Sequence, residues 1–110
     1  MQYVRCVNNE GYAVSLTVGA VYKQLPTNEL EQGSIRIVDN SGEDYLFAPN
    51  RFEPVVLIGK DNSHADKSVT AHIPTWLHGV LNAEALAANK SVSALVRQLI
   101  EERFDLPTAA

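Results

Sequence analysis

Several short runs of strand-forming residues occur over the first sixty positions of the chain, and residues of two kinds alternate in two of them, 3–6 and 35–38. These runs lie at residues 3–6, 20–25, 35–38, 45–47 and 55–58, and turn-forming residues separate them. An alternation with a period of two is typical of strands that bury one face. Four or five short strands in so little chain predict a small, strongly bent β-barrel. Because Pro54 precedes the last run, we expect that strand to begin near a sheet edge.

A different pattern occupies the second half of the chain. Residues 68–73 alternate once more and predict a single half-buried strand, whereas apolar residues recur at helical spacing over 76–88 and 92–104. Pro74 stands where the first of these helices would start, and Asn89 can adopt the left-handed conformation that ends it. Ser91 is a good N-cap for the second helix. Ala94 follows at its third position, so only the serine half of a capping box is expected.

The polar run between the two patterns has no hydrophobic period. We interpret residues 60–67 as a linker between a domain of residues 1–59 and a domain of residues 68–105, which a tail of residues 106–110 follows. The strand at 68–73 is isolated in this arrangement, and the backbone of a lone strand lacks hydrogen-bond partners. It therefore either joins the N-terminal sheet or pairs with its own copy in a second chain.

Composition narrows the class of protein. At 45% hydrophobic and 20% charged residues, the chain is expected to fold as a globular α+β protein. Cys6 is the only cysteine, no His/Cys cluster has zinc spacing, and we expect neither a metal nor another cofactor. The N-terminus lacks the apolar core of a signal peptide, and no apolar run reaches transmembrane length. These features favour a protein of the bacterial cytoplasm without a membrane partner.

Charge and side-chain chemistry limit the function further. The formal net charge is −4, which speaks against general nucleic-acid binding, so a DNA interface would depend on where its few basic groups lie. Glu43 and Asp44 are paired carboxylates, but a hairpin tip is a solvated place. No nucleophile with a base and an orienting group is recognisable, and we expect no catalytic residues and no enzyme.

The segment Ser68-Val-Thr-Ala-His-Ile-Pro74, followed by Ser91-Val-Ser-Ala-Leu-Val-Arg-Gln-Leu-Ile-Glu101, resembles the ribbon-helix-helix family of the CopG, Arc and MetJ type. The resemblance covers residues 67–104. It implies an intertwined homodimer that lays a two-stranded β-ribbon into the major groove of double-stranded DNA.

The alternation of the strand assigns residues to three roles in such a dimer. The side chains on the groove face would contact bases, and they are Ser68, Thr70 and His72. The start of the second helix and the flanking lysines would contact phosphates, through Lys67, Lys90, Ser91, Val92 and Ser93. The apolar residues of the strand and the helices would form the dimer interface, namely Val69, Ala71, Ile73, Leu77, Leu95, Val96, Leu99 and Ile100.

The N-terminal part has a resemblance of its own. The run Ser41-Gly-Glu-Asp-Tyr-Leu-Phe47 with Arg51-Phe-Glu-Pro54 resembles a small SH3-like barrel module of bacterial proteins, and the similarity covers residues 2–57. Five aromatic residues of this part either line a peptide groove or fill the core, and we expect most of them to fill the core. They are Tyr12, Tyr22, Tyr45, Phe47 and Phe52.

The sequence thus predicts an SH3-like β-barrel followed by a dimerising β-α-α module. The function that this arrangement favours is a homodimeric DNA-binding regulator, such as a transcriptional repressor, a plasmid copy or partition regulator, or an antitoxin. The alternative is an interaction adaptor that does not bind DNA. In that case the helical module only dimerises, and the barrel binds a protein partner.

Overall fold

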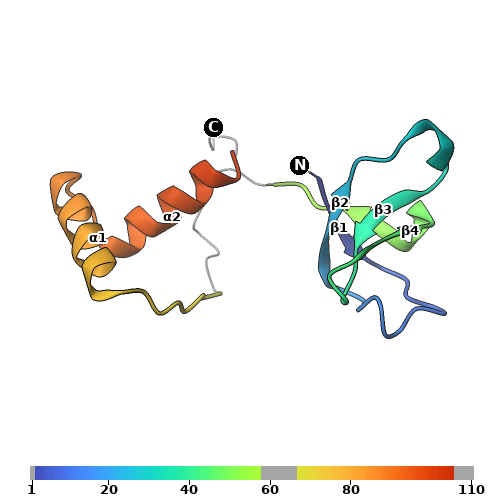
Figure 1. Ribbon diagram of the computed structural model, residues 1–110, viewed down its shortest axis with the longest axis horizontal. Helices are drawn as coiled ribbons and strands as arrows, with labels where there is room; N and C mark the ends of the chain where they lie inside the picture. Colours follow the sequence, from blue (N-terminus) through green and yellow to red (C-terminus); the bar gives the residue numbers. More distant parts are fainter. Residues whose placement is uncertain (1, 58–66, 106–110) are drawn as a thin grey trace. The chain divides into compact units, whose positions relative to one another are not determined.

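The computed structural model describes residues 2–57 and 67–105 (Figure 1). The chain is an α+β protein that divides into two compact units, residues 1–56 and residues 57–110. The first unit is a sheet and the second contains two helices. The predicted linker at 60–67, except for Lys67, and the predicted tail at 106–110 lie outside the described residues.

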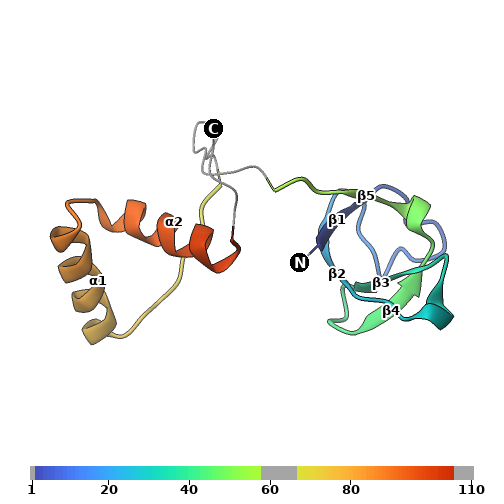
Figure 2. The same cartoon turned by 90° about the horizontal axis from the view of Figure 1, so that it is seen from above.

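The first unit is a five-stranded antiparallel sheet with the order β4-β3-β2-β1-β5 (Figure 2). Its strands are β1 (Gln2–Cys6), β2 (Val21–Leu25), β3 (Ile35–Val38), β4 (Asp44–Phe47) and β5 (Phe52–Pro54). Two 3₁₀ turns interrupt the connections, η1 (Glu29–Glu31) before β3 and η2 (Pro49–Arg51) before β5. The coarse α+β prediction is confirmed. The sheet does not close into a barrel, because η2 carries the chain from one edge strand to the other and no ladder joins β4 to β5 among the described residues.

The last strand lies earlier in the sequence than the apolar run at 55–58 predicts. β5 ends at Pro54, and Val55–Leu57 are not part of a strand. The register with β1 pairs Cys6 with Phe52 and Val4 with Pro54, which buries the Phe52 ring in the core. The Val55 N–H still donates to the Tyr3 carbonyl at 2.9 Å, but Val56 is 79% exposed. Core packing of one aromatic ring therefore decides the position of this strand.

One hydrophobic cluster forms the core of the first unit. Alternate residues of β1, Val4 and Cys6, point into it, as the period of two predicts. The buried residues are Val4, Cys6, Leu16, Tyr22, Ile37, Phe47 and Phe52. Edge-to-face contacts join the three aromatic rings, with centroids 6.0 Å apart for Phe47 and Phe52 and 6.5 Å apart for Tyr22 and Phe52. Leu16 is fully buried although it lies in the irregular β1–β2 connection.

The second unit contains α1 (Thr75–Ala87) and α2 (Val92–Arg103), close to the predicted ranges. Both predicted boundary residues between the helices are confirmed. Asn89 has φ of 56°, and the Ser91 hydroxyl accepts a 3.0 Å hydrogen bond from the Ala94 N–H. The strand predicted at 68–73 is not formed in this single chain, and the sheet of the first unit gains no sixth strand from the described residues.

Candidate nucleic-acid interface

The segment that precedes α1 exposes both of its faces in the single chain. Ser68, Thr70 and His72, the predicted base-contacting residues, are all exposed, as is Lys67. The residues predicted to face the dimer are exposed too. Val69 is 93% exposed, and Ala71 and Ile73 are exposed as well. The segment therefore has the alternating sequence that is typical of a half-buried strand. In the single chain, however, neither of its two faces is buried.

The two helices likewise leave their apolar residues uncovered. Among the described residues of the second unit, Ala85 alone is buried. Leu77 and Leu95 are half-buried, and Leu99 is 47% exposed. Val96 and Ile100 are exposed to a similar degree. Fully burying a side chain of this size contributes about 1.5–3 kcal/mol, so this unit gains little of the hydrophobic stabilisation that its sequence offers.

The N-terminus of α2 is capped and has further donors. The first N–H groups of an α-helix have no acceptor within the helix. The Ser91 side chain satisfies the Ala94 N–H, which leaves the backbone N–H groups of Val92 and Ser93 for a further acceptor. The Ser93 hydroxyl is exposed beside them. This is the arrangement in which a helix start binds phosphate.

Lys90 lies next to this helix start but is already engaged. Its ammonium group donates to the Gln98 side-chain carbonyl, and Gln98 Nε2 donates to Glu102 Oε1 at 2.9 Å. The sequence pattern of apolar positions gave no sign of this row of polar contacts, although Gln98 and Glu102 stand four apart on one helix face. A phosphate at the helix start would draw Lys90 away from Gln98.

Acidic residues are sparse in the segments predicted to contact DNA. No carboxylate occurs in residues 67–83 or 85–100, and Glu101, Glu102 and Asp105 gather at the end of α2. Asp66 directly precedes Lys67 in the sequence, whereas Lys90 has no acidic residue within five positions on either side. The net charge of the whole chain, −4, conceals this distribution.

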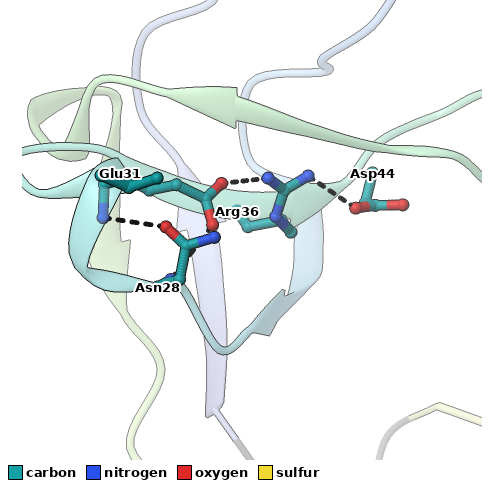
Figure 3. A network of polar contacts seen from close by, with 5 residues as sticks. Asn28, Glu31, Arg36 and Asp44 are labelled. Atoms are coloured by element: carbon teal, nitrogen blue, oxygen red, sulfur yellow. Dashed lines mark hydrogen bonds and ion pairs between the residues drawn. The ribbon is translucent and has the colours of Figure 1, made fainter.

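The first unit carries a polar network that sequence analysis did not find (Figure 3). The Arg36 guanidinium lies between two carboxylates, with an ion pair to Glu31 and a 2.8 Å ion pair to Asp44. Glu31 also accepts a 3.1 Å hydrogen bond from the Asn28 N–H, and Asn28 in turn caps η1. The Asn28 N–H, and after it Arg36, lower the pKa of Glu31 below its ordinary value. The network ties η1 to β3 and β4 and has the features of a structural site.

The aromatic residues of the first unit divide into two groups. Tyr22, Phe47 and Phe52 fill the core, as expected for most of the five. Tyr12 and Tyr45 are 44% and 48% exposed, and they line an open cleft of about 430 Å³ beside β4. Nothing in the alternation of the strands distinguishes these two tyrosines from the buried ones.

Three further observations bound the chemistry of the chain. Within residues 2–57 and 67–105, no three His, Cys, Asp or Glu side chains are grouped so that they could hold a metal ion. In the same ranges, neither helix has the length and hydropathy needed to cross a bilayer. Comparison of the chain with family models, curated proteins and solved structures gives no match.

Proposed function

We propose that this protein is a homodimeric DNA-binding regulator that reads the major groove with a β-ribbon. Residues 68–73 of two copies would pair to form the ribbon. Such a regulator would act as a transcriptional repressor, as a plasmid copy or partition regulator, or as an antitoxin. The first unit would be an SH3-like module, and its strand order supports this, because a four-stranded meander with a fifth strand returning beside the first forms a partly open barrel.

The observation that carries the proposal is the second unit's lack of a core. Two helices with apolar faces, whose described residues include one buried side chain, Ala85, do not make a stable fold alone. An unpaired alternating segment lies directly before them. A second copy would satisfy both needs at once, because antiparallel pairing of the segments completes a ladder and covers Leu95 and Leu99. The exposed Thr70 and His72 would then lie on the outer face of the ribbon, where side chains can reach base edges.

Selection of bound fragments from random double-stranded DNA tests the proposal directly. The full-length chain at moderate salt should enrich a two-fold symmetric sequence, because an isologous dimer presents the same residues to two half-sites. The enriched fragment should be bound by two copies of the chain. Recovery of unselected sequence, together with a monomer at micromolar concentration, would contradict the proposal.

The exposed cleft of the first unit favours a second candidate function, an adaptor that binds a protein partner. Residues 1–56 contain four basic and seven acidic residues, 4 − 7 = −3, which does not suit contact with DNA. In this case the helices would dimerise without contacting DNA. The same selection separates the candidates, because an adaptor enriches no DNA sequence.

A further inference from the structure

The cleft beside β4 follows the edge of a strand. Three consecutive residues of β4 line it, Tyr45, Leu46 and Phe47. Successive side chains of a strand point to opposite faces of the sheet, so a surface that all three residues line runs along the strand edge and not over one face. β4 is an outer strand of the sheet, with β3 as its one neighbour among the described residues.

The pairing register shows which backbone groups of β4 are turned outward. The Asp39 N–H donates to the Glu43 carbonyl at 3.0 Å, which makes this pair hydrogen-bonded. Hydrogen-bonded pairs alternate with non-bonded pairs along an antiparallel ladder. The next bonded pairs are therefore Ile37 with Tyr45 and Ile35 with Phe47. The backbone N–H and C=O groups of Asp44 and Leu46 consequently point away from β3, toward the open edge.

The Tyr12 ring also lines the cleft, and two neighbouring side chains contact it. The Phe47 ring meets it edge to face with centroids 5.3 Å apart, and the Arg51 guanidinium lies 4.7 Å from its centroid. Arg51 in turn donates to the Glu10 carbonyl at 2.7 Å. Tyr12 stays 44% exposed although it is fixed by these contacts. An exposed aromatic ring and the outer edge of β4 therefore line the same cleft.

One end of the cleft is acidic. Asp39 lines the cleft although it is only 7% exposed, and the exposed Glu43 directly precedes β4. Neither forms an ion pair with a described residue, in contrast to Asp44, which pairs with Arg36. Asp39 Oδ1 accepts two hydrogen bonds from Ser41, at 2.8 Å from the backbone N–H and 2.5 Å from the hydroxyl. Glu43 accepts one from the Tyr45 hydroxyl at 2.6 Å, which raises the pKa of Tyr45.

We propose that this cleft binds an extended, basic peptide segment of a protein partner, which adds to β4 as a sixth strand. The outward backbone groups of Asp44 and Leu46 would pair with the peptide backbone, as in β-strand addition to other sheet edges. Apolar side chains of the peptide would pack on Tyr12 and Tyr45. A lysine or arginine would lie beside Asp39 and Glu43, which form no ion pair with a residue in 2–57 or 67–105. The proposal concerns the first unit only and stands apart from DNA binding by the second.

A displayed library of random octapeptides, selected on the full-length chain, tests this proposal. The expected enriched peptides alternate lysine or arginine with β-branched or aromatic residues. Glu43→Gln should weaken the best peptide about fivefold, the value of an exposed ion pair. Glu53→Gln, which removes an exposed carboxylate from β5 on the opposite edge, is the matched control and should change nothing.

Backbone methylation of the selected peptide separates strand addition from other modes of binding. Methyl groups on the amides that face β4 should abolish binding, whereas methyl groups on the intervening amides should be tolerated. Equal effects of the two patterns, enrichment of acidic peptides or no enrichment would overturn the proposal. DNA binding by Glu43→Gln should equal that of the wild type, so failure here is distinguishable from failure of the DNA-binding proposal.

Discussion

The phenol hydroxyl of Tyr22 donates a 2.7 Å hydrogen bond to the Asn40 side-chain carbonyl, 18 residues along the chain. The same hydroxyl accepts a 2.8 Å hydrogen bond from the Thr17 backbone N–H. Asn40 Nδ2 lies 3.2 Å from the Val14 carbonyl and 3.2 Å from the Thr17 hydroxyl, and it donates to both. These contacts hold the β1–β2 connection, which contains the buried Leu16, against β2 and the β3–β4 hairpin.

Tyr22→Phe should therefore destabilise the first unit while keeping its aromatic packing. The substitution removes the hydrogen bonds of the hydroxyl with Thr17 and Asn40, each of which contributes about 0.5–1.5 kcal/mol. Urea unfolding followed by circular dichroism at 218 nm measures the change. Tyr12→Phe is the matched control, because the Tyr12 hydroxyl forms no hydrogen bond with any described residue, and it should leave the unfolding midpoint in place. Equal midpoints for the two variants would show that the network adds nothing.

Asn89 ends α1 in the left-handed conformation, with φ of 56°. Asn89→Ala should destabilise the helical unit by about 1 kcal/mol, because alanine lacks the short polar side chain that makes the left-handed conformation accessible to asparagine. Asn89→Gly should be close to neutral, since glycine adopts positive φ without strain. Thermal unfolding followed at 222 nm compares the variants. If both substitutions lowered the unfolding temperature equally, the left-handed backbone conformation would not be the cause of the loss.

The Glu31 carboxylate should make the stability of the first unit sensitive to acid. Its folded pKa is lowered, first by the Asn28 N–H and then by Arg36, so its contribution is fully present above the ordinary pKa of about 4.3 and is lost as the pH falls through the lowered folded value. Glu31→Gln should thus lower the urea midpoint at pH 7 and match the wild type at strongly acidic pH. A difference between the two proteins that stays constant with pH would rule out this linkage.

Leu99 lies on the uncovered apolar face of α2 and is 47% exposed in the single chain. If two copies bury it, Leu99→Asp places a charge in the interface and should weaken the dimer by several kcal/mol. Sedimentation velocity at micromolar concentration should show a wild-type dimer and a monomeric variant. Val14→Asp is the control, because Val14 is 91% exposed in the first unit, and it should remain dimeric.

The ribbon proposal assigns base contacts to Thr70 and His72 and predicts a specific loss on their removal. The Thr70→Ala/His72→Ala variant should lose about 1–3 kcal/mol of affinity for each good contact with a selected site, without change in oligomeric state. Ser93→Glu should weaken binding to all DNA sequences alike, because it places a negative charge at the start of α2. Fluorescence anisotropy with selected and scrambled duplexes separates the two effects. Unchanged affinity of the double variant would remove the ribbon from the interface.

The salt dependence of DNA binding gives an independent measure of the phosphate contacts. The segments predicted to contact DNA carry only Lys67 and Lys90 as basic residues. Each neutralised phosphate contributes about −0.9 to the slope of log affinity against log salt, so the slope should be shallow. Two lysines from each of two copies give about −3.6 at most by this relation. A much steeper slope would indicate basic residues elsewhere, such as Arg97 and Arg103.

Local chemistry determined the elements that the sequence could predict. Helix boundaries at Asn89 and Ser91 depend on the conformational preference and hydrogen bonding of single residues, so they can be inferred without knowing what surrounds them. The strands at 3–6 and 35–38 follow from alternation along the chain, and those at 20–25 and 45–47 from short β-rich runs next to turn residues. The α+β class follows from the change of hydrophobic period between the two halves.

The tertiary structure decided what depends on residues far apart in the sequence. Burial of Phe52 placed β5 at residues 52–54, earlier than the apolar run at 55–58 predicts. Leu16 entered the core from a connection that has no hydrophobic period. Tyr12 and Tyr45 stay exposed whereas Tyr22 is buried. This difference depends on the pairing of β4 and on the Asn40 contacts that hold the β1–β2 connection against the sheet. Hydrophobic period describes one element at a time, whereas core packing is settled by the fit among elements that only the folded chain brings together.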